Sequence, residues 1–385
     1  MGLKSYDRPV ALPRGVAGAF AAWLYGDGPP PWNRSVMADE KNSFPGGSRE
    51  RVSRAGERVR SGEATEEDLA VIDTWRAAHR PVLNTFQAIL RNRTKGSNVI
   101  VAQRHKRKNT IFDKLRRLPR MQLGRMDDVA GCRLIFSDIE QLYYFRDTLS
   151  EARFNHVLKN EPDKYDYIKN PKVTGYRGIH DIYAYDAKSI EGQKYKGLLI
   201  ELQFRTIYQH AWATTVEVVG IVTGNQPKFQ EGDKRYEHIL RLASEIIARA
   251  FEKEKSSLPH LTDAELVDEF IALDGELNFM AMLRGLNAAD KEISDNKNII
   301  LMLNPSSDDL EIRSYRDATE ALRALFELER EAAGRDIVLV RADTSEEVKI
   351  AFRNYFSDAR EFINLIDRGC QIFPRAKRQS GVTMR

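Results

Sequence analysis

The chain has 385 residues and a formal net charge of only +4, so it has room for about two to three domains and its average charge indicates no particular partner. Its two cysteines, Cys132 and Cys370, form no CxxC pair or Cys/His cluster, which argues against a disulfide framework or a structural zinc site and favours the reducing cytoplasm. No apolar run approaches the roughly 18 residues that a membrane-spanning helix needs, so we expect a soluble protein that does not enter membranes.

The N-terminal part of the chain changes character near residue 47. Residues 1–46 are rich in Gly and Pro, as in "GDGPPPWNRS", and show no sustained hydrophobic period, so we expect an irregular arm. Helical spacing begins after Thr65, a typical N-cap residue that is followed by acidic residues. Pro81 is expected to bend or break this helical region, and a second helix is expected near residues 109–118.

The stretch between residues 91 and 120 is strongly basic. It carries eleven Lys and Arg residues and a single acidic residue, Asp113. Such a concentration of positive charge is typical of segments that bind phosphate groups. A solvated basic helix face would produce the same pattern.

Strands and helices alternate through the middle of the chain. We expect strands at "VAGCRLIF" (129–136), "GIHDIYAYD" (178–186) and "KGLLIELQFR" (196–205). A helix at 138–152 separates the first two strands, and a long helix should begin near residue 207. This order predicts an α+β fold with a mixed β-sheet flanked by helices, assigned to a middle domain of residues 47–255.

A second unit should follow the linker-like sequence "EKSSLPHLT". Its pattern predicts helices at 263–290, 316–333 and 345–366 and strands at 298–304, 310–315 and 336–342. We therefore expect a separate, smaller α/β domain at residues 260–372, followed by a basic tail at 373–385.

The strand around Glu201 shows a clear period of two. Leu198, Ile200, Leu202 and Phe204 fall on one face, while the other face carries polar residues: Glu201, Gln203 and Arg205. A half-exposed strand with a solvated side would give this pattern. A polar face turned toward a ligand would give it as well.

Four segments of the middle domain suggest a more specific interpretation: "RHKRKNTIFDKLRR" (104–117), "MDDVAGCRLIF" (126–136), "GYRGIH" (175–180) and "ELQFRT" (201–206). In this order they resemble the synthetase domain of the RelA/SpoT homologues, the alarmone synthetases, over about residues 65–225. The resemblance implies a nucleotidyltransferase-like fold. It also implies an Mg²⁺-dependent pyrophosphokinase that transfers the β,γ-diphosphate of ATP to the 3′-hydroxyl of GDP or GTP, which yields (p)ppGpp.

The donor nucleotide needs cations for its phosphates. Arg104, Lys106, Lys114 and Arg117 can supply them, and Lys114 and Arg117 can share one helical face with Thr110. By resemblance, Arg133 stacks against the adenine together with Arg104. These five residues, Arg104, Lys106, Lys114, Arg117 and Arg133, are the expected ATP-binding set.

The resemblance also assigns the metal and acceptor residues. It implies that Asp128 and Glu201 hold Mg²⁺ and that Glu201 activates the 3′-hydroxyl. Tyr176 is expected to stack on the acceptor base, and the remaining acceptor residues are expected to be Arg177, His180, Gln203, Arg205 and His210.

The chain departs from the family pattern on the acceptor side. The family helix commonly reads W-A-x-x-E-H, whereas "WATTVEVV" places Glu217 one residue late and Val218 near where the His is sought. His210 also occupies a position that often carries Asn. Guanosine nucleotides remain the expected acceptor, and an adenosine nucleotide or a tRNA 3′ end, as in toxin-type relatives, is the alternative.

The sequence leaves the control of such an activity open. No HDxxED motif is present, so we expect no hydrolase half that would remove the product. Restraint would then come from a neutralising partner protein or from the flanking segments, and the C-terminal domain could serve restraint or homo-oligomer formation. A non-enzymatic RNA-binding or regulatory module is a third hypothesis, although the chain retains Asp128, Tyr176 and Glu201.

Overall fold

The computed structural model describes residues 44–223, 232–285, 298–304, 309–331, 336–341 and 359–373. The elements below belong to one compact unit, Pro45–Arg385. The expected irregular arm and basic tail lie almost wholly outside the described residues, as does most of the helix expected at 345–366.

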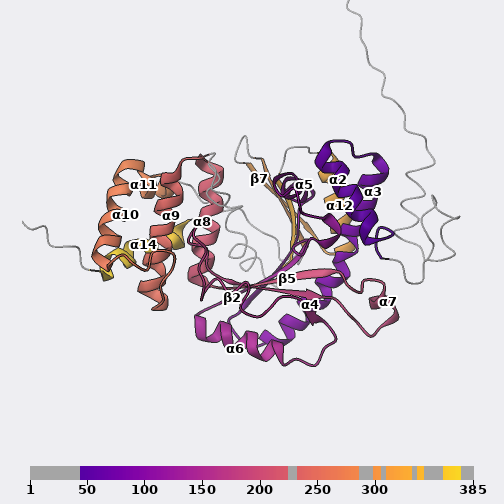
Figure 1. Cartoon of the computed structure of the whole chain (residues 1–385), viewed down its shortest axis with the longest axis horizontal. Coiled ribbons are helices and arrows are strands. Elements are labelled where there is room, and N and C mark those ends of the chain that lie inside the picture. The colour runs from indigo at the N-terminus through magenta and orange to yellow at the C-terminus, as the bar shows by residue number, and fades with distance from the viewer. Residues whose placement is uncertain are drawn as a thin grey trace, which may run out of the picture. The chain divides into compact units, whose positions relative to one another are not determined.

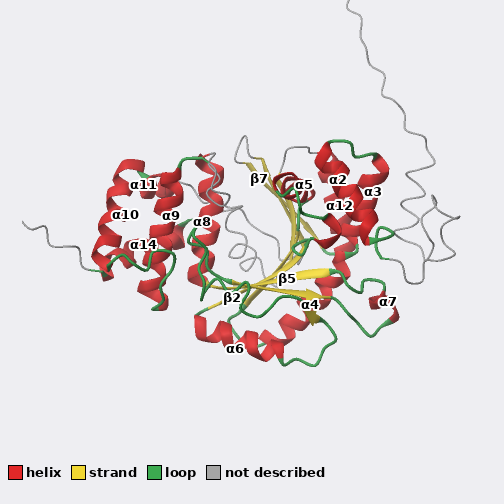
Figure 2. Ribbon diagram, viewed as in Figure 1, coloured by secondary structure: helices red, strands yellow, loops and turns green. Residues whose placement is uncertain are grey.

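The strands form one mixed sheet in which, among the described residues, eight strands follow the order β3-β4-β5-β2-β1-β8-β6-β7. Figures 1 and 2 show this sheet curving between groups of helices. The strand bounds are β1 (Ile100–His105), β2 (Ala130–Phe136), β3 (Val157–Leu158), β4 (Ile179–Ala184), β5 (Leu199–Thr206), β6 (Asn298–Asn304), β7 (Asp309–Tyr315) and β8 (Asp336–Arg341). The predicted α+β class with a mixed sheet is confirmed.

The N-terminal helices are α2 (Arg49–Ser61), α3 (Glu66–Ala77), α4 (His79–Thr94) and α5 (Lys108–Arg117). Thr65 caps α3 as expected, because its hydroxyl accepts the N–H of Asp68 while the Asp68 carboxylate accepts the N–H of Thr65. The helical region breaks at Ala78, and Pro81 lies in the first turn of α4, where its missing N–H costs little.

The face of the central strands that carries Leu202 and Phe204 is covered by helices. The α4 helix packs against β1 and β2, and α6 (Ile139–Ser150) packs against β2 and β5, as Figure 1 shows. A short helix, α7 (Ile190–Gln193), lies in the connection between β4 and β5. The opposite face of β1, β2, β4 and β5 carries the polar side chains.

The register places these polar side chains in two neighbouring rows, because residues directly opposite each other on paired strands point to the same face. One row contains Arg104, Gly131, Glu201 and Ile182, and the next contains Ala102, Arg133, Gln203 and His180. Since Gly131 has no side chain, the first row leaves space between Arg104 and Glu201. The sheet thus assembles groups from four strands at one place.

The C-terminal strands continue this same sheet, which corrects the prediction of a separate α/β domain at residues 260–372. Strand β8 pairs with β1 through Gln103↔Arg341 and Arg104↔Val340, and β6 pairs with both β8 and β7. The helix α12 (Ala318–Glu331) packs on these three strands. The alternation of strands and helices was predicted correctly, but an alternating pattern does not show which sheet the strands join.

A second group of helices has its own apolar core. It contains α8 (Ile207–Thr223), α9 (Lys234–Ile247), α10 (Asp263–Leu277), α11 (Phe279–Gly285) and α14 (Arg360–Ile372). Buried side chains from all five helices meet, for example Trp212, Leu240, Leu266, Phe279 and Phe362. The predicted boundary near residue 255 therefore does not separate two cores.

No helix in the described part of the chain is both long enough and apolar enough to span a bilayer.

We expect Phe204→Ala to lower the free energy of unfolding by about 3–5 kcal/mol, as for other buried Phe residues. Phe204 is 0% exposed, and its ring lies 6.3 Å from that of Phe136 and 6.4 Å from that of Phe145. Urea denaturation measures the change. The control is Tyr144→Ala on the outer side of α6, 73% exposed, which should change stability by less than about 0.5 kcal/mol. Equal effects of the two substitutions would contradict the packing described here.

Candidate active site

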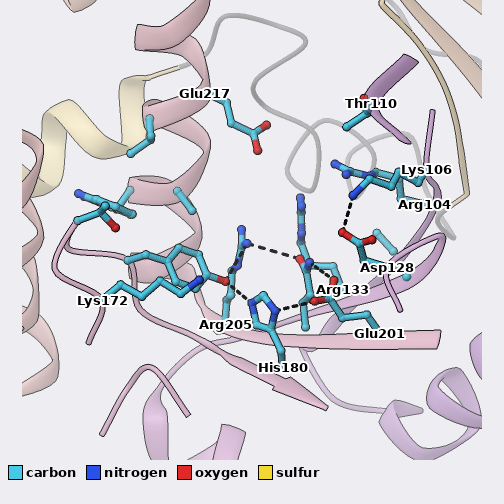
Figure 3. Close-up of a pocket in the computed structure, with 18 of the residues that line it drawn as sticks. Arg104, Lys106, Thr110, Asp128, Arg133, Lys172, His180, Glu201, Arg205 and Glu217 are labelled. Atoms are coloured by element: carbon cyan, nitrogen blue, oxygen red, sulfur yellow. Dashed lines mark hydrogen bonds and ion pairs between the residues drawn. The ribbon is translucent and has the colours of Figure 1, made fainter. Parts of the chain in front are cut away.

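A cavity of about 290 Å³ lies over the polar face of the sheet. Its floor comes from β1, β2, β4 and β5, and its walls come from α8, α9 and the loop before β4 (Figure 3). The polar and charged lining residues are Arg104, Lys106, Thr110, Asp128, Arg133, Lys172, Thr174, Tyr176, His180, Glu201, Gln203, Arg205, Glu217 and Glu237.

Three guanidinium groups meet on the floor of the cavity. They belong to Arg104 of β1, Arg133 of β2 and Arg205 of β5. Burial, together with the positive charges of Arg205 and Arg104, lowers the pKa of Arg133 to about 9. A site that lowers the pKa of an arginine favours the entry of an anion, because negative charge would offset the repulsion among the three groups.

Asp128 lies where the chain enters β2, beside two lysines. Its Oδ2 atom pairs with Nζ of Lys106 and lies 3.0 Å from Nζ of Lys114. Burial alone would raise the pKa of Asp128, but the charges of Lys106 and Lys114 lower it. Burial also lowers the pKa of Lys106 to about 8. The carboxylate is therefore ionised at neutral pH.

The second oxygen of Asp128 offers a site for a cation. This buried Oδ1 atom has no hydrogen-bond partner among the described residues, and Glu201 lines the same cavity. No group of three or more His, Cys, Asp or Glu side chains suited to a metal occurs in the described ranges. The two carboxylates of Asp128 and Glu201 are oxygen donors of the kind that Mg²⁺ accepts, since this ion often takes one or two carboxylates and completes its shell with phosphate oxygens and water.

A hydrogen-bonded chain joins Tyr176, His180 and Glu201. The Tyr176 hydroxyl lies 2.6 Å from Nε2 of His180, and Nδ1 of His180 lies 2.7 Å from Oε1 of Glu201. Gln203 donates its Nε2 to Oε2 of Glu201 at 2.6 Å. Both oxygens of Glu201 are thus held at fixed positions above the sheet.

These contacts shift all three ionisations. Burial opposes the charge on Glu201, but His180 and the hydrogen bond from Gln203 lower its pKa far below the usual range. Burial likewise opposes the charge on His180, while Tyr176 and Glu201 raise its pKa to about 9. For Tyr176, the charges of Arg205 and His180 outweigh burial and lower the pKa to about 7.

The Tyr176 ring stands between the floor and the helical wall. The guanidinium of Arg205 lies 5.2 Å and the ammonium of Lys172 5.3 Å from the ring centroid. The Trp212 ring lies 6.4 Å away, and its N–H donates to the carbonyl of Leu240 at 2.7 Å. Tyr176 thus presents an aromatic ring to the cavity with two cations close to it.

Nine residues predicted from the sequence line this cavity: Arg104, Lys106, Asp128, Arg133, Tyr176, His180, Glu201, Gln203 and Arg205. The predicted site residues did not include the helical wall, which is formed by Trp212, Ala213, Val216 and Glu217 of α8 and Glu237 and Leu240 of α9. Figure 3 shows the Glu217 carboxylate directed into the cavity. The sequence contained a hint of Glu217, because a Glu one residue away belongs to the family pattern. Nothing in the sequence indicated that Glu237 would line the cavity.

Four other predicted residues lie outside the lining that the described residues form. The guanidinium of Arg177, expected near acceptor phosphates, forms a buried ion pair with Glu252 instead. Tyr176 and Arg177 therefore point to different places, although they are neighbours in the chain. His210 is buried within α8 at 2% exposure, Arg117 is exposed on α5, and Lys114 reaches Asp128 from α5.

Comparison with known proteins identifies the domain. Residues 103–219 match the model of the region found in RelA and SpoT proteins. These residues form a RelA/SpoT domain. Most residues that line the cavity lie within this range. The exceptions are Ala102, which directly precedes it, and Glu237 and Leu240 of α9.

Individual proteins with sequences similar to this chain align with it over different lengths. The GTP pyrophosphokinase YjbM of Bacillus subtilis is 30% identical over 107 residues, which are 27% of this chain and 48% of the relative. The uncharacterised protein Rv1366 of Mycobacterium tuberculosis is 27% identical over 194 residues, or 49% of this chain and 65% of the relative. The chain therefore spans about half to two thirds of the length of these curated relatives.

Among solved structures, small alarmone synthetase 1 of Bacillus subtilis is similar to this chain with a TM-score of 0.38 and 23% identity. The match covers 53% of this chain and 95% of that chain.

Glu201→Gln should lower the pKa of His180, because the carboxylate is one of the groups that hold this pKa at about 9. The raised pKa stabilises the fold fully below pH 6.5, and this contribution is lost as the pH rises through about 9. In the variant the loss should begin at lower pH. NMR titration of the His180 ring measures the pKa, with the exposed Glu161→Gln as control. An unchanged pKa would show that the two side chains do not interact in solution.

Proposed function

We propose that the chain is a magnesium-dependent pyrophosphokinase that transfers the β,γ-diphosphate of ATP to the 3′-hydroxyl of GDP or GTP. The observation that carries this proposal is the meeting of Asp128 and Glu201 in one cavity with three guanidinium groups and the Tyr176 ring. The RelA/SpoT domain and the similarity to a GTP pyrophosphokinase support it.

In the proposed reaction, the 3′-oxygen of the acceptor forms a bond to the β-phosphorus of ATP. The bond between this phosphorus and the oxygen that bridges to the α-phosphorus breaks, and AMP leaves with that electron pair. The hydroxyl proton passes to Glu201. One diphosphate group therefore passes from ATP to the acceptor, and no oxidation or reduction takes place.

The low pKa of Glu201 shapes its role in this reaction. The ionised carboxylate accepts hydrogen bonds from His180 and Gln203 and can accept a third from the 3′-hydroxyl of the acceptor. A strong base is not required, because phosphoryl transfer passes through a loose transition state that depends chiefly on position and charge. Glu201 would orient the hydroxyl first and receive its proton late.

The cations of the floor would hold the phosphates. Arg104 and Arg133 come from adjacent strands, and their guanidinium forks match phosphate oxygens. Lys106, at the end of β1, adds a point charge. Bound Mg²⁺, held by Asp128 and Glu201, would supply further neutralisation of the phosphate charge.

The acceptor would occupy the side of the cavity near α8. Tyr176 offers a surface for stacking, and Ala213 and Val216 of α8 provide apolar contact. Glu217 can accept hydrogen bonds from base N–H groups, a contact that suits the adjacent N1–H and amino donors of guanine. This chemistry favours a guanosine acceptor.

Incubation of the purified chain with γ-labelled ATP should transfer label to GDP or GTP. AMP, ADP and bulk tRNA, each offered separately, should stay unlabelled. Glu201→Gln should reduce transfer at least about 1,000-fold, since it removes the charge that orients the hydroxyl. The control is Glu191→Gln on α7, an exposed residue that does not line the cavity. Label on tRNA or AMP instead would assign the alternative acceptor, and full activity of Glu201→Gln would refute its role.

Asp128→Asn should raise the Mg²⁺ concentration needed for half-maximal activity by about tenfold or more, because a metal-ligating charge is lost. Chelation of Mg²⁺ by EDTA should abolish transfer in the unmodified chain. The matched control is Asp113→Asn, an exposed aspartate of α5 that pairs with Arg116. Activity that persists in EDTA would exclude the proposed metal.

A further inference from the structure

The backbone that carries Lys106 is held in place from behind the cavity by residues distant in sequence. The N–H of Lys106 donates to the carbonyl of Val129 at 2.8 Å, and its carbonyl accepts Nη2 of Arg76 at 3.0 Å. The ring Nε2 of His105 lies 2.8 Å from the carbonyl of Arg76. Arg76 of α3 thus contacts both residues at the point where β1 ends.

Arg76 is in turn held by the C-terminal helix α12. It is 0% exposed, and its two terminal nitrogens contact the two carboxylate oxygens of Glu329 at 2.9 and 3.0 Å. Its guanidinium also lies 5.2 Å from the ring centroid of Phe326, one turn earlier on α12. A bidentate pair of this kind fixes both partners in orientation as well as in distance.

Glu329 also contacts the start of α5 directly. The first residue of this helix, Lys108, donates its N–H to Oε1 of Glu329 at 3.2 Å, while the N-cap residue Arg107 provides no side-chain cap. A carboxylate at a helix N-terminus satisfies a free N–H and interacts favourably with the helix dipole. Glu329 therefore acts as the cap of α5 from a position more than 200 residues away.

We propose that Glu329 is a positioning residue for the donor nucleotide: together with Arg76 it fixes the segment His105–Lys108 so that Arg104 and Lys106 meet the ATP phosphates. This inference rests on the proposed function, because it takes these two cations as phosphate ligands. It assigns a role in the site to the segment of residues 298–341, which lies beyond the RelA/SpoT region.

The Glu329–Arg76 contact is important because β8, which belongs to the same C-terminal segment as α12, pairs with β1 over a short length. Strand β8 meets β1 through only two residue pairs among the described residues, and one of them contains Arg104 itself. By comparison, β1 pairs with β2 along six residues. The Glu329–Arg76 pair therefore adds a direct side-chain link from α12 to the segment that carries Arg104 and Lys106.

Glu329→Gln tests the proposal, because it removes the charge but preserves size and one acceptor oxygen. We expect the KM for ATP to rise about tenfold, while kcat and the KM for the acceptor stay within about twofold. Glu329→Ala, which also removes the cap of Lys108, should have a larger effect. The matched control is Glu327→Gln on the exposed side of α12, which should leave all three parameters unchanged.

A binding measurement separates this proposal from the proposed function. The probe is an ATP analogue with a methylene group in place of the oxygen between the α- and β-phosphates, titrated without acceptor. Its Kd should rise in Glu329→Gln by the same factor as the KM. If the unmodified chain binds the analogue but transfers no diphosphate, the proposed function fails and the comparison of Kd values still decides the role of Glu329. Equal Kd values, or no binding to the unmodified chain, would overturn the proposal.

Hydrogen exchange distinguishes positioning from a general loss of stability. In Glu329→Gln, amide exchange should accelerate at residues 105–112, while β2, β4 and β5 keep their protection. Faster exchange throughout the sheet would show that Glu329 supports the whole fold, and that result would overturn a positioning role.

Discussion

The repulsion among three buried or half-buried guanidinium groups is the constraint around which this structure is organised. Arg104, Arg133 and Arg205 lie on adjacent strands, and burial together with the charges of Arg205 and Arg104 lowers the pKa of Arg133 to about 9. The strands cannot move apart to relieve the repulsion, because their opposite face is packed against α4 and α6. The fold therefore keeps a concentration of positive charge that a polyanionic ligand can neutralise.

The sequence predicted the parts of the site that follow from local patterns. The period of two between residues 198 and 205 correctly places Glu201, Gln203 and Arg205 on one face of a strand. The cavity around them depends on register, and register is not visible in a single sequence: nothing in "VAGCRLIF" shows that Gly131 lies opposite Glu201. The order of the four motifs indicated that these residues form one site only because it resembles the order in a known family.

The contributions of distant segments could not be predicted in the same way. Glu237 enters the cavity because α9 packs beside α8, and Glu329 reaches Arg76 because β8 extends the sheet beyond β1. Both are glutamates on amphipathic helices, where the sequence pattern indicates only a solvated face. Their positions depend on long-range packing, which the composition and period of a helix do not encode.

The direct passage from β5 into α8 has a consequence for how such a site can change over time. Thr206 ends the strand and Ile207 begins the helix, so floor and wall belong to one uninterrupted piece of backbone with no loop between them. A bulkier or differently hydrogen-bonding base therefore cannot be admitted by changing the length of a loop between floor and wall. New acceptors would have to arise through exchange of single side chains along the inner side of that helix, at Ala213, Val216 or Glu217. Under the proposed function, the choice of acceptor can thus change in small steps while the groups on the sheet below stay the same.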